Sequence, residues 1–276
     1  MLSIAGSDSG GGAGIQADLK AFAACGVHGM TAVTAITAQN TVGVTAVHTI
    51  PPEIIRAQVQ AVAQDIGVDA VKIGMLGTAE TIEAVRHAVQ DLRTLAPGTP
   101  VVLDPVMVSE SGSELLEPEA RVALIEQLLP LATVVTPNVP EARQLAGAGE
   151  DQAPEELARA IHALGPEIVV VTGGHRERAT DVFYDGEQMI EIHGPRYPDG
   201  AAHGSGCTHS SVLAARLAQG DSPLQAARIA KQRAAEAVKN GLIDVGAGPG
   251  PVDVLGVTDG LGVTDGVGVT DGLGVT

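Results

Sequence analysis

Short apolar runs alternate with amphipathic stretches along most of this chain. The continuous apolar runs, typical of parallel strands covered on both faces, occupy 2–5, 31–38, 70–73, 101–103, 133–136 and 168–172. Between them apolar residues recur at intervals of three and four, which predicts helices over 14–25, 52–64, 78–95, 119–129, 154–164, 210–219 and 224–240. This alternation predicts an α/β fold with a mainly parallel central sheet and helices on both faces.

Two segments depart from that pattern. Residues 182–193 alternate around Asp185-Gly186, which predicts an antiparallel hairpin. From residue 255 the hexapeptide Leu-Gly-Val-Thr-Asp-Gly repeats to the last residue, in too few copies for a capped solenoid and with too few acids for calcium. We therefore expect one folded domain over 1–254 and a low-complexity, disordered tail over 255–276.

Composition restricts the partners of the chain. Only 1% of the 276 residues are aromatic, so stacking platforms for single-stranded nucleic acid are nearly absent. A net charge of −17 disfavours both nucleic acid and anionic membrane surfaces. Two cysteines, with no apolar run of about 18 residues, indicate free thiols in a cytoplasmic protein rather than a disulfide framework or a membrane span.

The run His203-Gly204-Ser205-Gly206-Cys207-Thr208 carries the strongest chemical signal. Its glycines permit a tight turn in which backbone N–H groups converge, and the helix behind it adds a positive dipole end. An anion is expected there, most simply a phosphoryl group in transfer, and the same field is expected to lower the pKa of Cys207. The alternative is an ordinary helix start with a small buried cysteine.

Further polar clusters follow the predicted strands. A glycine-rich run, 6–14, follows the first strand, Gln39-Asn40 the second and Asp104 the fourth. Thr136-Pro137-Asn138 and Thr172-Gly173-Gly174-His175 follow the last two. Each has a simpler explanation as a turn or helix cap; Asn138 with Glu141, for example, also fits a capping box. Since carboxyl ends of parallel strands share one edge of a sheet, all should line one ligand site.

These motifs, in this order, closely resemble the hydroxymethylpyrimidine/phosphomethylpyrimidine kinases. The matching segments are 6–20, 37–41, 72–76, 104–107, 136–138 and 203–208, and the resemblance spans about 2–250. It implies a ribokinase-like fold and ATP-dependent phosphorylation of 4-amino-5-hydroxymethyl-2-methylpyrimidine, then of its monophosphate, in thiamine biosynthesis. It also implies a homodimer.

The resemblance assigns roles to individual residues. Cys207 is expected as catalytic base, with Gly204, Ser205 and Gly206 forming the anion hole around it. The expected pyrimidine contacts are Gln39, Asp8, Ala13, Met75 and Val106. The expected ATP contacts are Asn138, Glu141, Thr172 and Thr208, and Asp104 and Glu141 are expected to hold Mg²⁺ through water.

Two positions depart from the family pattern. Thr172 stands where relatives often carry lysine, so a cation near the ATP phosphates is expected to be missing. His209 stands where an apolar residue is usual. Two other functions remain open: a pyridoxal kinase of the same fold, and a non-catalytic pyrimidine-binding protein.

Overall fold

A single eight-stranded sheet organises the computed structural model, which describes residues 1–109, 112, 114–173 and 179–257. The strand order is β10-β9-β8-β7-β6-β5-β1-β2, parallel from β2 to β8 and antiparallel at β9 and β10. The bounds are β1 Leu2–Ala5, β2 Met30–Val33, β5 Val71–Ile73, β6 Val101–Leu103, β7 Val134–Val135, β8 Ile168–Val171, β9 Ala179–Tyr184 and β10 Met189–Gly194. The mainly parallel sheet predicted from the apolar runs is therefore confirmed.

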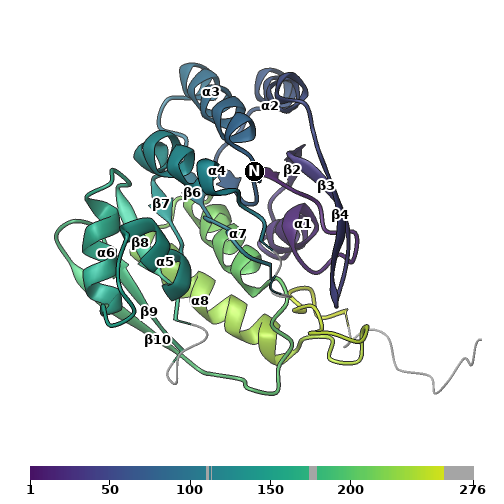
Figure 1. Cartoon of the computed structure of the whole chain (residues 1–276), viewed down its shortest axis with the longest axis vertical. Coiled ribbons are helices and arrows are strands. Elements are labelled where there is room, and N and C mark those ends of the chain that lie inside the picture. Colours follow the sequence, from purple (N-terminus) through teal and green to yellow (C-terminus); the bar gives the residue numbers. More distant parts are fainter. Residues whose placement is uncertain (110–111, 113, 174–178, 258–276) are drawn as a thin grey trace, which may run out of the picture.

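Helices cover both faces of the sheet (Figure 1), because the apolar strands must be shielded from water on each side. One face packs against α2 Pro52–Asp65, α3 Ala79–Leu95, α4 Pro118–Ala123, α5 Val139–Ala146 and α6 Pro154–His162. The other face packs against α1 Gly14–Ala24, α7 Ser205–Ala218 and α8 Pro223–Lys239, which lie side by side. No helix in the described ranges is long and apolar enough to cross a membrane.

The chain reverses its direction across the sheet beside β1. It first places β2 on one side of β1 and then continues with β5 on the other side. In open α/β sheets such a switch point leaves a crevice at the carboxyl ends of the strands. The loops after β1 and β5 therefore lie at the position where a sheet of this kind is expected to bind a ligand.

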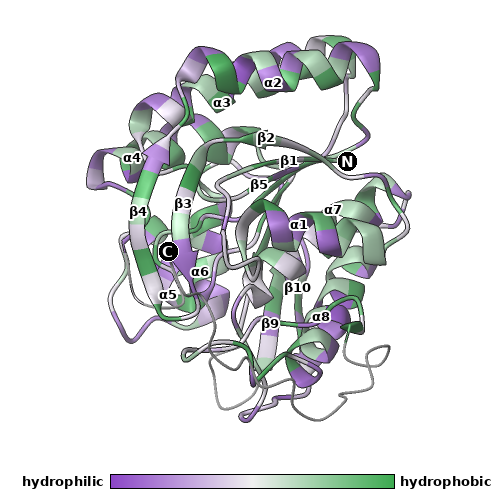
Figure 2. Cartoon of the chain, turned by 90° about the vertical axis from the view of Figure 1, so that its right-hand side faces the viewer, coloured by the Kyte–Doolittle hydropathy of each residue, from purple (hydrophilic) through white to green (hydrophobic). Residues whose placement is uncertain are grey.

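Several elements differ from the sequence expectation. The run 31–38 is split, since β2 ends at Val33 and β3 Ala35–Asn40 leaves the sheet to pair with β4 Gly43–Thr49. Figure 2 shows this hairpin beside the main sheet, with hydrophobic segments on both strands. At the break, the Thr34 hydroxyl donates to the backbone carbonyl of Met75, and this long-range contact is invisible to local pattern.

Two helical regions also differ. The helix expected over 119–129 becomes α4, a π turn Leu124–Leu128 and a 3-10 turn Leu129–Leu131. The helix expected from 210 begins at Ser205, because Gly204 at φ +85° allows the chain to enter it directly from the glycine turn. By contrast, the hairpin around Asp185-Gly186 is present as β9 and β10. From 258 onward the repeat tail lies outside the described residues.

A buried ion pair joins the two layers near the switch point. Lys72 on β5 and Asp18 on α1 are both fully buried, with Nζ and Oδ1 2.8 Å apart. Ser3 and Ser211 donate further hydrogen bonds to the Asp18 carboxylate. Burial favours the neutral amine, but the charge and hydrogen bond of Asp18, together with Cys207 and Asp104, outweigh it and hold the pKa of Lys72 above its ordinary value.

We expect Lys72→Met to lower the free energy of unfolding by about 3–5 kcal/mol, because it leaves the Asp18 charge buried without a cation. Urea denaturation at neutral pH measures the loss. Arg56→Met is the control: it removes an exposed Arg56–Asp91 pair and should cost less than about 1 kcal/mol. A Lys72→Met protein as stable as the parent would contradict this account of the pair.

Candidate active site

A cavity of about 420 Å³ opens at the carboxyl ends of the parallel strands, within the size range of small-molecule sites. It is lined by the loop after β1, the end of β3, the loops after β5, β6, β7 and β8, and the start of α7. All five strand-end motifs thus contribute residues to one cavity. Gln39 and Cys207 both line it, although they are 168 positions apart in the sequence. His175 lies outside the described residues.

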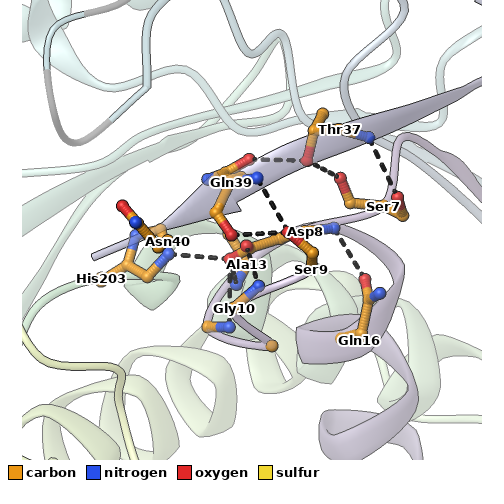
Figure 3. A network of polar contacts seen from close by, with 12 residues as sticks. Ser7, Asp8, Ser9, Gly10, Ala13, Gln16, Thr37, Gln39, Asn40 and His203 are labelled. Atoms are coloured by element: carbon orange, nitrogen blue, oxygen red, sulfur yellow. Dashed lines mark hydrogen bonds and ion pairs between the residues drawn. The ribbon is translucent and has the colours of Figure 1, made fainter. Parts of the chain in front are cut away.

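Asp8 organises the glycine-rich loop between β1 and α1 (Figure 3). Its carboxylate accepts hydrogen bonds from the backbone N–H groups of Gly10, Gly12 and Ala13, and lies 2.9 Å from Nε2 of His203. These bonds outweigh burial and hold the pKa of Asp8 below its ordinary value. With its oxygens engaged in this way, Asp8 shapes the loop; it also lines the cavity, and its direct contact with a pyrimidine stays a prediction.

The remaining expected pyrimidine contacts also line the cavity. Ala13, Met75 and Val106 present apolar groups to it. The Gln39 carboxamide is oriented by Thr37, whose hydroxyl donates to Oε1 at 3.2 Å (Figure 3). A carboxamide held above an apolar floor can pair with the polar edge of a heteroaromatic ring.

The turn before α7 has the backbone geometry that the predicted anion hole requires. Gly204 packs so closely on the Gly12 carbonyl that a side chain at 204 could not fit, which joins the two glycine loops. The N–H groups of Gly206 and Cys207 lie in the first turn of α7, where a helix has no internal acceptors. The Ser205 N–H, expected in the same hole, instead bonds to the Ala202 carbonyl, so the hole is smaller than predicted.

The expected low pKa of Cys207 is wrong. Burial is the largest influence and, with the charges of Asp18 and Asp104, raises the pKa of the thiol to about 12, despite opposing effects of Lys72 and the Gly14 N–H. The prediction considered the helix dipole but not the desolvation of the sulfur or the nearby carboxylates. In the free protein, Cys207 is therefore a thiol at neutral pH.

Two carboxyl groups line the cavity beside Cys207. Asp104, after β6, accepts a hydrogen bond from Ser210 and lies 4.0 Å from Nζ of Lys72. Glu141 forms the capping box of α5 with Asn138, so the simpler alternative is realised, yet both residues also line the cavity. Burial and the charge of Asp104 raise the pKa of Glu141 to about 8.

The nucleotide contacts expected from sequence divide into two groups. Asn138, Glu141 and Thr172 line the cavity, whereas Thr208 is fully buried in α7 and does not. The expected Thr208 contact is thus wrong, because the early start of α7 turns this side chain into the core.

Sequence reasoning missed two charged groups. Asp181 on β9 and Lys231 on α8 both line the cavity and pair at 2.6 Å. The only indication in the sequence is the apolar periodicity of β9 and α8, and it predicts that both positions are buried without predicting a role in a ligand site.

A nucleotide-sized crevice at a switch point, an anion turn at a helix start and nearby carboxylates define a phosphotransferase with a ribokinase-like α/β fold. Comparison with known proteins agrees. The family model described as phosphomethylpyrimidine kinase matches residues 8–253. The hydroxymethylpyrimidine/phosphomethylpyrimidine kinase of Rhizobium meliloti is 48% identical over 257 residues, 91% of this chain and 95% of that protein.

Solved structures share the fold. An ADP complex of Bacillus subtilis pyridoxal kinase superposes with a TM-score of 0.82 at 43% identity, covering 91% of this chain and 96% of that one. A phosphomethylpyrimidine kinase from Clostridium difficile gives 0.73 at 41% identity, covering 83% and 95%. The chain belongs to the phosphomethylpyrimidine kinase family.

The raised pKa of Glu141 predicts how stability depends on pH. Between the ordinary carboxyl pKa and about 8, the folded protein binds a proton that the unfolded chain has released, so the free energy of unfolding should fall as pH rises. Thermal unfolding from about pH 5 to about pH 9 measures this decline. Glu141→Gln, which preserves the capping box, should flatten the curve. An equal decline in both proteins would contradict the assignment.

Proposed function

We propose that this kinase transfers the terminal phosphoryl group of ATP to the hydroxymethyl group of 4-amino-5-hydroxymethyl-2-methylpyrimidine, and then phosphorylates the monophosphate, in thiamine biosynthesis. The observation that carries the proposal is one cavity holding the Gln39 carboxamide, the Cys207 thiol and the turn 204–207. The Gln39 carboxamide can recognise the edge of a ring, the Cys207 thiol suits a reacting hydroxyl group, and the turn 204–207 suits a phosphoryl group. The family membership of the chain supports the same substrate.

In the proposed reaction the pyrimidine ring lies on Ala13, Met75 and Val106, with Gln39 at its polar edge. The substrate hydroxyl oxygen forms a bond to the terminal phosphorus, and the bond from that phosphorus to the ADP oxygen breaks. The transferring group carries negative charge, which the N–H groups of Gly206 and Cys207 and the α7 dipole stabilise. Alignment and charge neutralisation supply most of the rate in such reactions.

We propose that Cys207 accepts the proton of the substrate hydroxyl as its thiolate. A pKa of about 12 makes this form scarce at neutral pH, but it is a strong base when present. The Lys72 ammonium and the Gly14 N–H favour the thiolate over the thiol. The rate should therefore rise with pH as more of the sulfur becomes ionised.

Magnesium is proposed at Asp104 and Glu141, through water. The charge of Asp104 raises the pKa of Glu141, so the two carboxyl groups lie close enough to interact and form an oxygen donor set suited to a hard divalent cation. When bound, the ion would supply positive charge to the ATP phosphates. Asn138 and Thr172 line the same part of the cavity and are proposed nucleotide contacts.

The decisive experiment measures ADP release with the free pyrimidine alcohol, its monophosphate and pyridoxal, each with Mg²⁺-ATP. We expect turnover with both pyrimidines. Pyridoxal is the second candidate, favoured by the structural similarity to a pyridoxal kinase. Higher kcat/KM with pyridoxal would replace the proposed substrate, and tight pyrimidine binding without ADP release would indicate a non-catalytic binding protein.

Cys207→Ala should lower kcat about 100-fold or more, because the proton acceptor is lost, while ADP affinity stays unchanged. Cys207→Asp should restore part of the activity and remove the rise of kcat with pH from about 6 to about 9. Full activity in the alanine variant would exclude Cys207 as the base.

We also propose a cytoplasmic homodimer, consistent with two free cysteines and with an incompletely covered hairpin. The side chains of Ile36, Val42 and Val47 on β3, β4 and their turn are each more than half exposed. A two-stranded hairpin of this kind is marginally stable alone and gains from a second copy. Light scattering should give twice the chain mass, and Val47→Asp should yield monomers; a monomeric parent protein would contradict the proposal.

A further inference from the structure

A second polar cluster lines the cavity on a different face of α7 from Cys207. Cys207, Ser210 and Ser211 face the buried groups Asp18, Lys72 and Asp104. His209 instead faces Asp181 on β9, with its Nε2 3.4 Å from Oδ2, and Asp181 in turn binds Lys231 of α8. The helix therefore separates two charged clusters, and the cluster of Asp181, His209 and Lys231 has no role in the proton transfer described above.

His209 is unusual because it is buried and its ring makes the contact with Asp181 but no hydrogen bond of good geometry within the described part of the chain. The residue is 4% exposed, and neither ring nitrogen has a hydrogen-bond partner among the residues that the structure describes. Oδ2 of Asp181 is also without one. Buried polar atoms in this state are costly, typically by about 1–3 kcal/mol each, and are retained where a ligand completes them.

The position of His209 on α7 places it close to the anion turn. It follows Ser205 by four residues and Gly206 by three, so the three residues share one helix face. Helical side chains lean toward the N-terminus, which directs the ring of His209 toward the turn. Ser205, Gly206 and His209 all line the cavity.

The surrounding charges favour an anion beside His209. Lys231 and Asp181 neutralise one another, and both His209 and Lys231 outweigh burial in holding the pKa of Asp181 below its ordinary value. An imidazolium can donate one N–H to Asp181 and the other to a ligand oxygen. Lys231 also begins a stripe on α8, continued by Ala234, Ala235 and Val238, which gives the cavity an apolar wall next to the charges.

We propose that His209, positioned by the Asp181–Lys231 pair, is a nucleotide-binding residue that donates a hydrogen bond to a phosphate oxygen of ATP or ADP. This inference deepens the proposed function, on which it rests for the identity of the nucleotide. The apolar stripe on α8 then accommodates less polar parts of the same molecule. When the β8–β9 register is continued by one residue, Thr172 lies opposite Asp181. Thr172 offers no charge to a phosphate group, and in our proposal His209 on α7 supplies the hydrogen-bond donor instead.

The test is calorimetric titration with ADP, and with adenosine as a probe lacking phosphate, in the absence of any pyrimidine. His209→Leu and His209→Met remove the donor and should weaken ADP binding about tenfold, as expected for a hydrogen bond to a charged group, while adenosine binding is unchanged. His209→Gln, which keeps an N–H donor, should recover part of the affinity. In steady state, the KM for ATP should rise while the KM for the alcohol stays constant.

His28→Leu is the matched control, since His28 is exposed and lies outside the cavity lining. The proposal is overturned if either apolar variant, folded by circular dichroism, binds ADP within about twofold of the parent; a higher melting temperature would then mark His209 as a core residue only. ADP binding without pyrimidine turnover would contradict the proposed function and leave this inference standing. A parent protein that binds no ADP would overturn both.

Discussion

The ammonium group of Lys72 connects the elements that supply the reaction centre. It reaches from β5 to Asp18 on α1 and to Asp104 after β6, while Ser210 and Ser211 join those carboxylates to α7. All of these side chains are buried, so each charge depends on the others for its solvation. The arrangement holds α1, α7 and two strands in fixed relation beneath Cys207, and it is also the electrostatic setting in which that thiol titrates.

The two glycine loops are likewise held together by a few direct contacts. Asp8 gathers the N–H groups of the first loop and meets His203 of the second, and Gly204 packs on the carbonyl of Gly12. The proposed substrate and phosphoryl sites are therefore joined by direct contacts, which suits the alignment that phosphoryl transfer requires. The cost is that Asp8 and the Ser205 N–H, both plausible ligand contacts by sequence, are engaged in holding the site together.

The start of α7 carries the residues proposed for both halves of the reaction on different faces of the helix. Cys207 lies on the face turned to the buried carboxylates, and His209 on the face turned to Asp181 and Lys231. Residues two positions apart on a helix point in widely different directions, so α7 presents the proposed proton acceptor and the proposed nucleotide contact on different faces. Cys207 and His209 therefore have different charged neighbours, and the helix dipole alone does not describe the electrostatic environment of either side chain.

The sequence by itself determined the alternation of strands and helices, the parallel sheet and the edge on which Asp8, Asp104, Asn138 and Thr172 meet. Those features follow from local apolar period and from the fact that parallel strands end together. Only the tertiary structure decided the departure of β3, with Gln39, into a hairpin, the early start of α7 at Ser205 and the burial of Thr208. It also decided the pKa of Cys207 and the cluster of Asp181, His209 and Lys231, because desolvation and charge pairing depend on groups far apart in the chain.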